Sequence, residues 1–64
     1  MKVIKSEVVE VMKQLKARGY GHEELAVALG KKTQTIWAWS SNAPIAIKRV
    51  PDKANFTILK RLLE

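Results

Sequence analysis

Apolar residues recur along much of the chain with the spacing of amphipathic helices. Between Ser6 and Arg18 the apolar residues recur at spacings of three and four. They are Val8, Val11, Met12 and Leu15. Residues spaced in this way lie on one face of an α-helix. The pattern predicts a first helix with one buried face, with Ser6 as its N-cap and Gly19 as its end. Tyr20 is expected to pack its ring against the helices that follow.

Two shorter helices are predicted next, over residues 22–29 and from Thr33 to Trp39 or Ser40. Gly30, between them, can adopt the positive φ that a tight turn needs. Two short helices joined so closely must cross steeply, with a small residue where they touch. The residues expected to face the core from this pair are Leu25, Ala26, Leu29, Ile36 and Trp39.

The last third of the chain is less regular. Residues 42–44 are expected to end the third helix. The β-branched content of residues 45–50 suits a short strand, and a short helix is the alternative, with extended or irregular structure favoured. Asp52 is expected to cap a last helix that buries Phe56, Leu59, Leu62 and Leu63. The expected fold is all-α, with four to five short helices in one domain and a short strand near 45–50 left open.

Residues 22–41 resemble the lambda repressor-like, or Cro-type, helix-turn-helix family. The matching residues are Glu23, Glu24, Leu25, Ala26, Leu29, Gly30, Ile36 and Trp39. The resemblance implies that residues 1–64 form a DNA-binding domain whose third helix enters the major groove with its N-terminal end first. The sequence departs from the family at Gly21, Lys31 and Lys32. Ser or Thr is common at the first and third of these positions, and a hydrophobic residue at the second.

The resemblance also implies which side chains touch DNA. Base contacts are expected from the side of the third helix that faces away from its buried pair, namely from Thr33, Gln34, Trp37 and Ala38. The Gln34 amide can pair with adenine N6 and N7. Phosphate contacts are expected from His22, Lys31, Lys32, Thr35, Lys48 and Arg49. The alternative for each of these polar residues is a solvated surface position.

Trp37 and Trp39 cannot lie on one helix face, because residues two apart point about 200° away from each other. Trp39 occupies the position that the family buries, so it is expected in the core. Trp37 then lies on or near the DNA-facing side. For Trp37, packing against residues 45–50 or in a dimer is favoured over stacking on DNA.

The charge balance agrees with a nucleic-acid partner. The 64 residues carry 12 Lys and Arg against 6 Asp and Glu, which gives a formal charge of +6. Such a field attracts polyanions, of which nucleic acid is the commonest. Several cations of the first helix region are nonetheless expected on a solvated face: Lys2, Lys5, Lys13, Lys16 and Arg18. No apolar run approaches the ~20 residues that cross a bilayer, so a cytoplasmic protein of a bacterium or phage is expected.

The expected function is that of a repressor that binds double-stranded DNA as a homodimer. No glycine-rich phosphate loop, nucleophile elbow or metal-ligand pair is found, and Cys is absent. Neither enzymatic activity nor a cofactor, metal or small-molecule ligand is therefore expected.

The last third of the chain has more apolar residues than one small core needs, and some of them are expected to form a dimer interface. The candidates are Ile45, Ile47, Val50, Ile58, Leu59, Leu62 and Leu63. The alternatives are a protein-interaction module of the antitoxin or anti-repressor type, and an architectural or recombination accessory protein that bends DNA.

Overall fold

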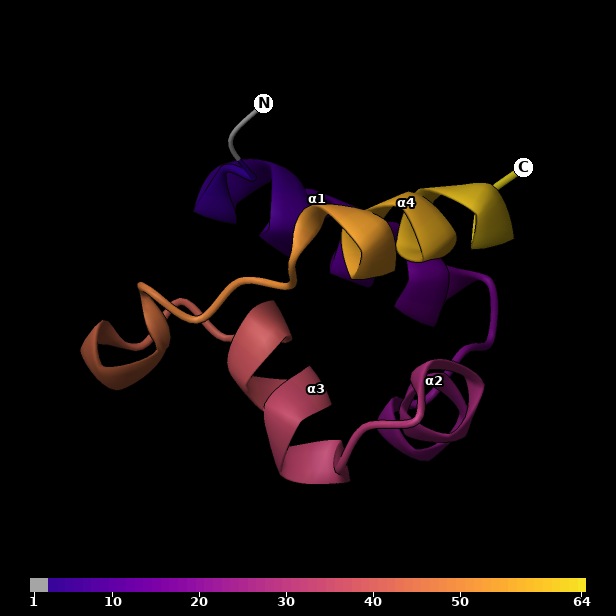
Figure 1. The fold of residues 1–64 in the computed structure, drawn as a ribbon, viewed down its shortest axis with the longest axis horizontal. Coiled ribbons are helices and arrows are strands. Elements are labelled where there is room, and N and C mark those ends of the chain that lie inside the picture. Colours follow the sequence, from indigo (N-terminus) through magenta and orange to yellow (C-terminus); the bar gives the residue numbers. More distant parts are fainter. Residues whose placement is uncertain (1–2) are drawn as a thin grey trace.

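The computed structural model describes residues 3–64, which form four α-helices and one short 3₁₀-helix (Figure 1). Their bounds are α1 Lys5–Ala17, α2 His22–Leu29, α3 Thr33–Ser40, η1 Pro44–Ala46 and α4 Lys53–Leu62. The prediction of an all-α fold is confirmed. The strand alternative for residues 45–50 is wrong, since no strand occurs between residues 3 and 64. Pro44 favours a helical first turn there because its ring fixes φ and it has no N–H to satisfy.

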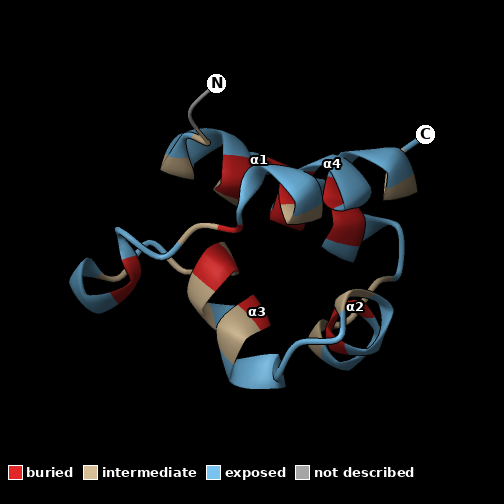
Figure 2. Ribbon diagram, in the orientation of Figure 1, coloured by how far each residue is buried: buried red, intermediate tan, exposed pale blue. Residues whose placement is uncertain are grey.

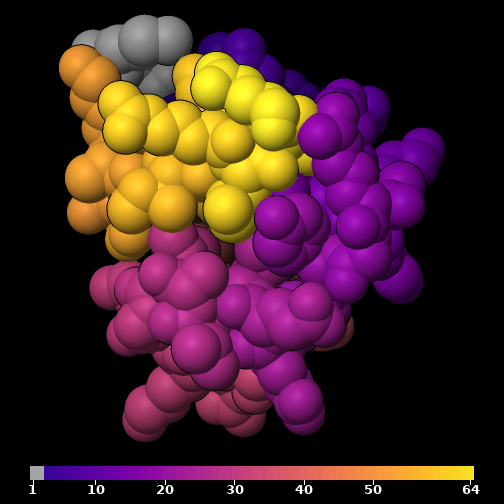
Figure 3. Space-filling view, turned by 90° about the vertical axis from the view of Figure 1, so that its right-hand side faces the viewer, coloured from indigo at the N-terminus to yellow at the C-terminus, as the bar shows by residue number. Residues whose placement is uncertain are grey.

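The helices pack in two pairs that share one core. α1 and α4 lie at one end of the molecule, and α2 and α3 lie at the other (Figures 1 and 3). α3 packs against both α1 and α2, while α4 packs against α1. None of the helices within residues 3–64 combines the length and the apolar content that crossing a bilayer requires.

The core draws side chains from all four α-helices, and their buried faces turn toward one another (Figure 2). Its members are Val8, Val11, Met12, Leu15, Leu25, Ala26, Ile36, Trp39, Phe56 and Leu59. The predicted apolar faces are therefore confirmed at these positions. Leu29, Leu62 and Leu63 are only half-buried at the edge of the core, and Tyr20 packs against it as expected.

The ends of α2 and α4 follow local sequence signals. Gly30 adopts a left-handed conformation with φ 67°, as a helix-ending glycine does. Asp52 caps α4, since its carboxylate accepts a hydrogen bond of 2.9 Å from the Asn55 backbone N–H. Both predictions are confirmed.

The start of α1 differs from the prediction. The backbone N–H of Val8 donates to the carbonyl of Ile4 at 3.1 Å, so the helix begins at Lys5 and Ile4 is the N-cap. Ser6 therefore lies inside the first turn, and the prediction that it caps the helix is wrong. No side chain caps this end. At the other end Arg18 is the C-cap, and Gly19 follows with φ 97°.

Lys5 joins three segments of the chain. Its Nζ donates to the carbonyl oxygens of Ala38 at 2.7 Å, Trp39 at 3.0 Å and Arg49 at 2.9 Å. These acceptors match the three donors of an ammonium group, and burial lowers the pKa of Lys5. The prediction that Lys5 belongs to a solvated face is wrong, because its partners stand more than thirty residues away in the sequence. The exposed cations expected on α1 and just after it are Lys13, Lys16 and Arg18, while Lys2 lies outside the described residues.

Candidate functional site

The turn between α2 and α3 leaves the beginning of α3 open to solvent. Gly30 has a positive φ in this turn, and Lys31, Lys32, Thr33 and Gln34 after it are all exposed. The N-cap of α3 is the backbone of Lys32, with no side-chain hydrogen bond to the free amides. This end of the helix pair therefore presents two cations and unpaired N–H groups, a combination that attracts anions.

α3 separates its buried and exposed residues as an amphipathic helix does. Ile36 and Trp39 are buried, and Gln34 lies exposed on the outside. Trp37 retains 50% of its surface exposed, although it is one of the largest apolar side chains in the chain. Ala38 is half-buried. The expectation that the two tryptophans point in different directions is confirmed, and packing covers only half of Trp37.

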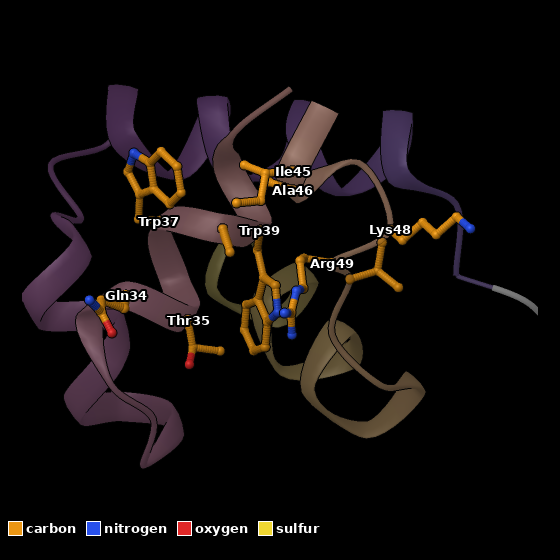
Figure 4. Close-up of a pocket in the computed structure, with 10 residues that line it drawn as sticks. Gln34, Thr35, Trp37, Trp39, Ile45, Ala46, Lys48 and Arg49 are labelled. Carbon is orange, nitrogen blue, oxygen red and sulfur yellow. The ribbon is translucent and has the colours of Figure 1, made fainter. Parts of the chain in front are cut away.

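A groove of about 570 Å³ runs between α3 and the segment that follows it. We call it the α3 groove. It is lined by Gln34, Thr35, Trp37, Ala38, Trp39, Ile45, Ala46, Lys48, Arg49 and Val50. Figure 4 shows Gln34 and Trp37 on one side, with Ile45, Lys48 and Arg49 on the other. Three of the residues predicted to contact bases and three of those predicted to contact phosphate thus lie around one groove.

The far wall of the α3 groove is held by contacts with the rest of the fold. Ala46 is only 1% exposed and anchors η1 in the protein. The Ala43 backbone N–H donates to Ser41 Oγ at 3.1 Å just after α3. The Lys5 bond to the Arg49 carbonyl fixes the other end of this wall. Lys48 and Arg49 therefore project from a braced segment.

His22 lies beside a second groove, of about 380 Å³, which we call the His22 groove. Ser40 Oγ stands 3.3 Å from His22 Nε2 and 2.9 Å from the Trp37 carbonyl. Since a hydroxyl has one proton, which Ser40 donates to that carbonyl, we assign the proton of this pair to His22 Nε2. Lys13 and Lys16 also line the groove.

The predicted site residues thus fall into three places. Most border the α3 groove, His22 borders the His22 groove, and Lys31, Lys32 and Thr33 lie at the turn without lining either. Trp37 lines both grooves and so forms the wall between them.

Sequence reasoning missed several residues of these grooves. Ile45, Ala46 and Val50 line the α3 groove, but the sequence pattern leaves residues 45–50 open between strand and short helix, with extended or irregular structure favoured, and none of the three is predicted as a site residue. Lys5 and Ser40 have partners far along the chain, and no local pattern indicates them. A proline directly before Ile45 was the one available signal, since it favours a helical turn over a strand.

No protein-family model, curated protein or solved structure matches the chain. The class of ligand is therefore inferred from the residues that line the two grooves. No Asp or Glu is among the residues that line either groove, whereas Lys13, Lys16, Lys48 and Arg49 are. Both grooves consequently favour an anionic ligand.

Proposed function

We propose that the protein is a sequence-specific DNA-binding regulator of the Cro-type helix-turn-helix family, acting as a repressor. The observation that carries the proposal is the α3 groove. It joins the hydrogen-bonding side chains of an exposed helix face to two cations on a braced segment, with no acidic residue among them. Reading base edges from a helix while cations hold the backbone is how such domains bind DNA.

In the proposed complex, α3 enters the major groove with its exposed N-terminal end first. Gln34 reads an adenine through N6 and N7, and Thr33 and Ala38 offer methyl groups to neighbouring thymines. Lys48 and Arg49 neutralise phosphates on one side of α3. Thr35 lines the same groove as these two cations and offers a hydroxyl there. The remaining phosphate contacts come from His22, Lys31 and Lys32. Neither catalysis nor a cofactor has a part in this function.

The proposed regulator acts as a dimer on a pseudo-palindromic operator. Two reading helices about 34 Å apart occupy successive major grooves, and the bound dimer blocks polymerase sterically. Ile47 and Ile58 are 54% and 41% exposed and offer apolar surface for self-association. Regulation then follows protein concentration, as in switch proteins of phages and mobile elements.

The test is a selection of bound duplexes from a random DNA pool, followed by affinity measurements with Gln34→Ala. We expect a palindromic consensus, and we expect Gln34→Ala to relax it at one base position per half-site. A lost bidentate contact of about 1–3 kcal/mol corresponds to a loss of discrimination of roughly fivefold to 150-fold. Gln14→Ala is the matched control, since Gln14 is exposed on α1 and bonds only Glu10 at 3.2 Å.

A protein-interaction module of the antitoxin or anti-repressor type is the second candidate. The observation that favours it is the exposure of Trp37 and Ile45 beside the α3 groove, since large apolar patches often mark protein contacts. It predicts that the selection enriches no sequence and that binding to DNA disappears as salt rises, because only the charge of +6 attracts the duplex.

A further inference from the structure

Two large apolar side chains remain exposed in the α3 groove. Ile45 is 81% exposed and Trp37 is 50% exposed. Both are in the upper part of Figure 4, Trp37 on α3 at one side of the groove and Ile45 on η1 at the other. The structure also fixes the direction of Ile45. In a 3₁₀-helix neighbouring side chains point about 120° apart, so burial of Ala46 holds Ile45 away from the core.

The same groove contains groups of two other kinds. Lys48 and Arg49 are its only charged lining residues, and Gln34 supplies an amide. An occupant that offers an apolar group, a hydrogen-bonding edge and an anion would find a partner for each of them along this groove. In the major groove an A·T pair presents adenine N6 and N7 and the C5-methyl of thymine on one edge. Each nucleotide also carries one phosphate.

We propose that the α3 groove receives one DNA strand at a thymine, whose methyl group packs between Trp37 and Ile45 while the adjoining phosphate binds Lys48 and Arg49. This inference rests on the proposed function and deepens it. Half of the methyl contact comes from Ile45 on η1, a segment outside the reading helix. The contact requires a thymine in the base pair that Gln34 reads or in the pair beside it. The apolar contact adds sequence preference that added salt does not screen, in contrast to the phosphate contacts.

The experiment replaces each thymine of the selected duplex, one at a time, with deoxyuridine, which lacks only the methyl group. Binding is measured for the wild type, for Ile45→Thr and for Val27→Thr. Val27 is the matched control because it is 84% exposed, lies on α2 and lines neither groove. Since Ile45 is almost fully exposed, Ile45→Thr removes apolar surface from the groove and takes nothing from the core.

We expect one thymine per half-site at which deoxyuridine weakens wild-type binding by about fourfold, the value of one buried methyl group. Val27→Thr should keep this difference, and Ile45→Thr should lose it. The inference is overturned if no thymine shows the effect or if Ile45→Thr retains it. Ile45 would instead belong to a protein contact if Ile45→Thr altered self-association or the binding of an acidic peptide while deoxyuridine still weakened binding. That outcome also overturns the inference. A consensus without a methyl effect refutes this inference alone, whereas a pool without any consensus refutes the proposed function with it.

Discussion

Asp52 and Ser6 both precede an amphipathic stretch and are both predicted as helix N-caps, but only Asp52 caps its helix. The Asp52 carboxylate accepts a hydrogen bond from a free backbone amide of α4 at 2.9 Å. Ser6 lies within the first turn of α1 and forms no side-chain cap. A capping side chain stabilises a helix only where it satisfies an amide that has no partner in the helix.

Asp52→Ala is expected to lower the free energy of unfolding by about 1 kcal/mol, the usual value of an N-cap. Ser6→Ala is expected to change it by no more than about 0.5 kcal/mol, as at an ordinary surface position. Urea unfolding of the two variants and the wild type measures the difference. Equal losses in both variants would contradict the assignment of the caps.

At the scale of elements, Lys5 determines how α3 meets the segment after it. Two of its acceptors are carbonyls near the end of α3, and the third belongs to Arg49. A helix leaves its last carbonyls without partners inside the helix, and here a side chain from α1 satisfies two of them. The same ammonium group thereby sets the distance between α3 and the wall that carries Lys48 and Arg49.

Lys5→Met is expected to destabilise the fold by about 1.5–3 kcal/mol, because hydrogen bonds to a charged group are lost while the aliphatic stem is kept. Lys13→Met removes the same charge from α1, where Lys13 is exposed, and should cost about 0.5 kcal/mol or less. Chemical denaturation of the pair checks this. Equal stability of the two variants would show that the three bonds contribute nothing net.

The elements that sequence reasoning predicted are those with local causes. The apolar spacing of α1, the glycine after α2 and the Asp at the start of α4 all act within a few residues. The three helices occur, although α1 begins at Lys5 and not after Ser6. The shape of residues 45–50 depends instead on burial of Ala46 and on the bond from Lys5 to Arg49. Such contacts join distant parts of the chain, so the sequence pattern left this segment open. The same dependence kept Ile45 out of the predicted site.

At the scale of the whole molecule, charge and apolar surface act against each other. A formal charge of +6 on 64 residues makes two free copies repel. Ile58 on α4 and Ile47 after η1 remain exposed and favour association. Binding to DNA neutralises part of the charge, so the proposed dimer should form more readily on an operator than in free solution.

Sedimentation at about tens of micromolar protein, a concentration chosen to populate weak dimers, is expected to show self-association that increases with operator DNA. Ile58→Asp should weaken it by placing a charge in the apolar interface. Val27→Asp makes an equivalent change on exposed α2 surface and should leave it unchanged. A monomer with and without DNA, for the wild type, would exclude the dimer.

The different burial of the two tryptophans gives the molecule two optical reporters. Trp39 is 5% exposed and Trp37 is 50% exposed. An indole in the core emits at shorter wavelength and is shielded from iodide, whereas a half-exposed indole emits at longer wavelength and is quenched. In Trp37→Phe the remaining indole emission comes from the buried Trp39 and follows chiefly unfolding. The difference between the two spectra isolates the indole that borders both grooves, so occupancy of either one can be followed without an added dye.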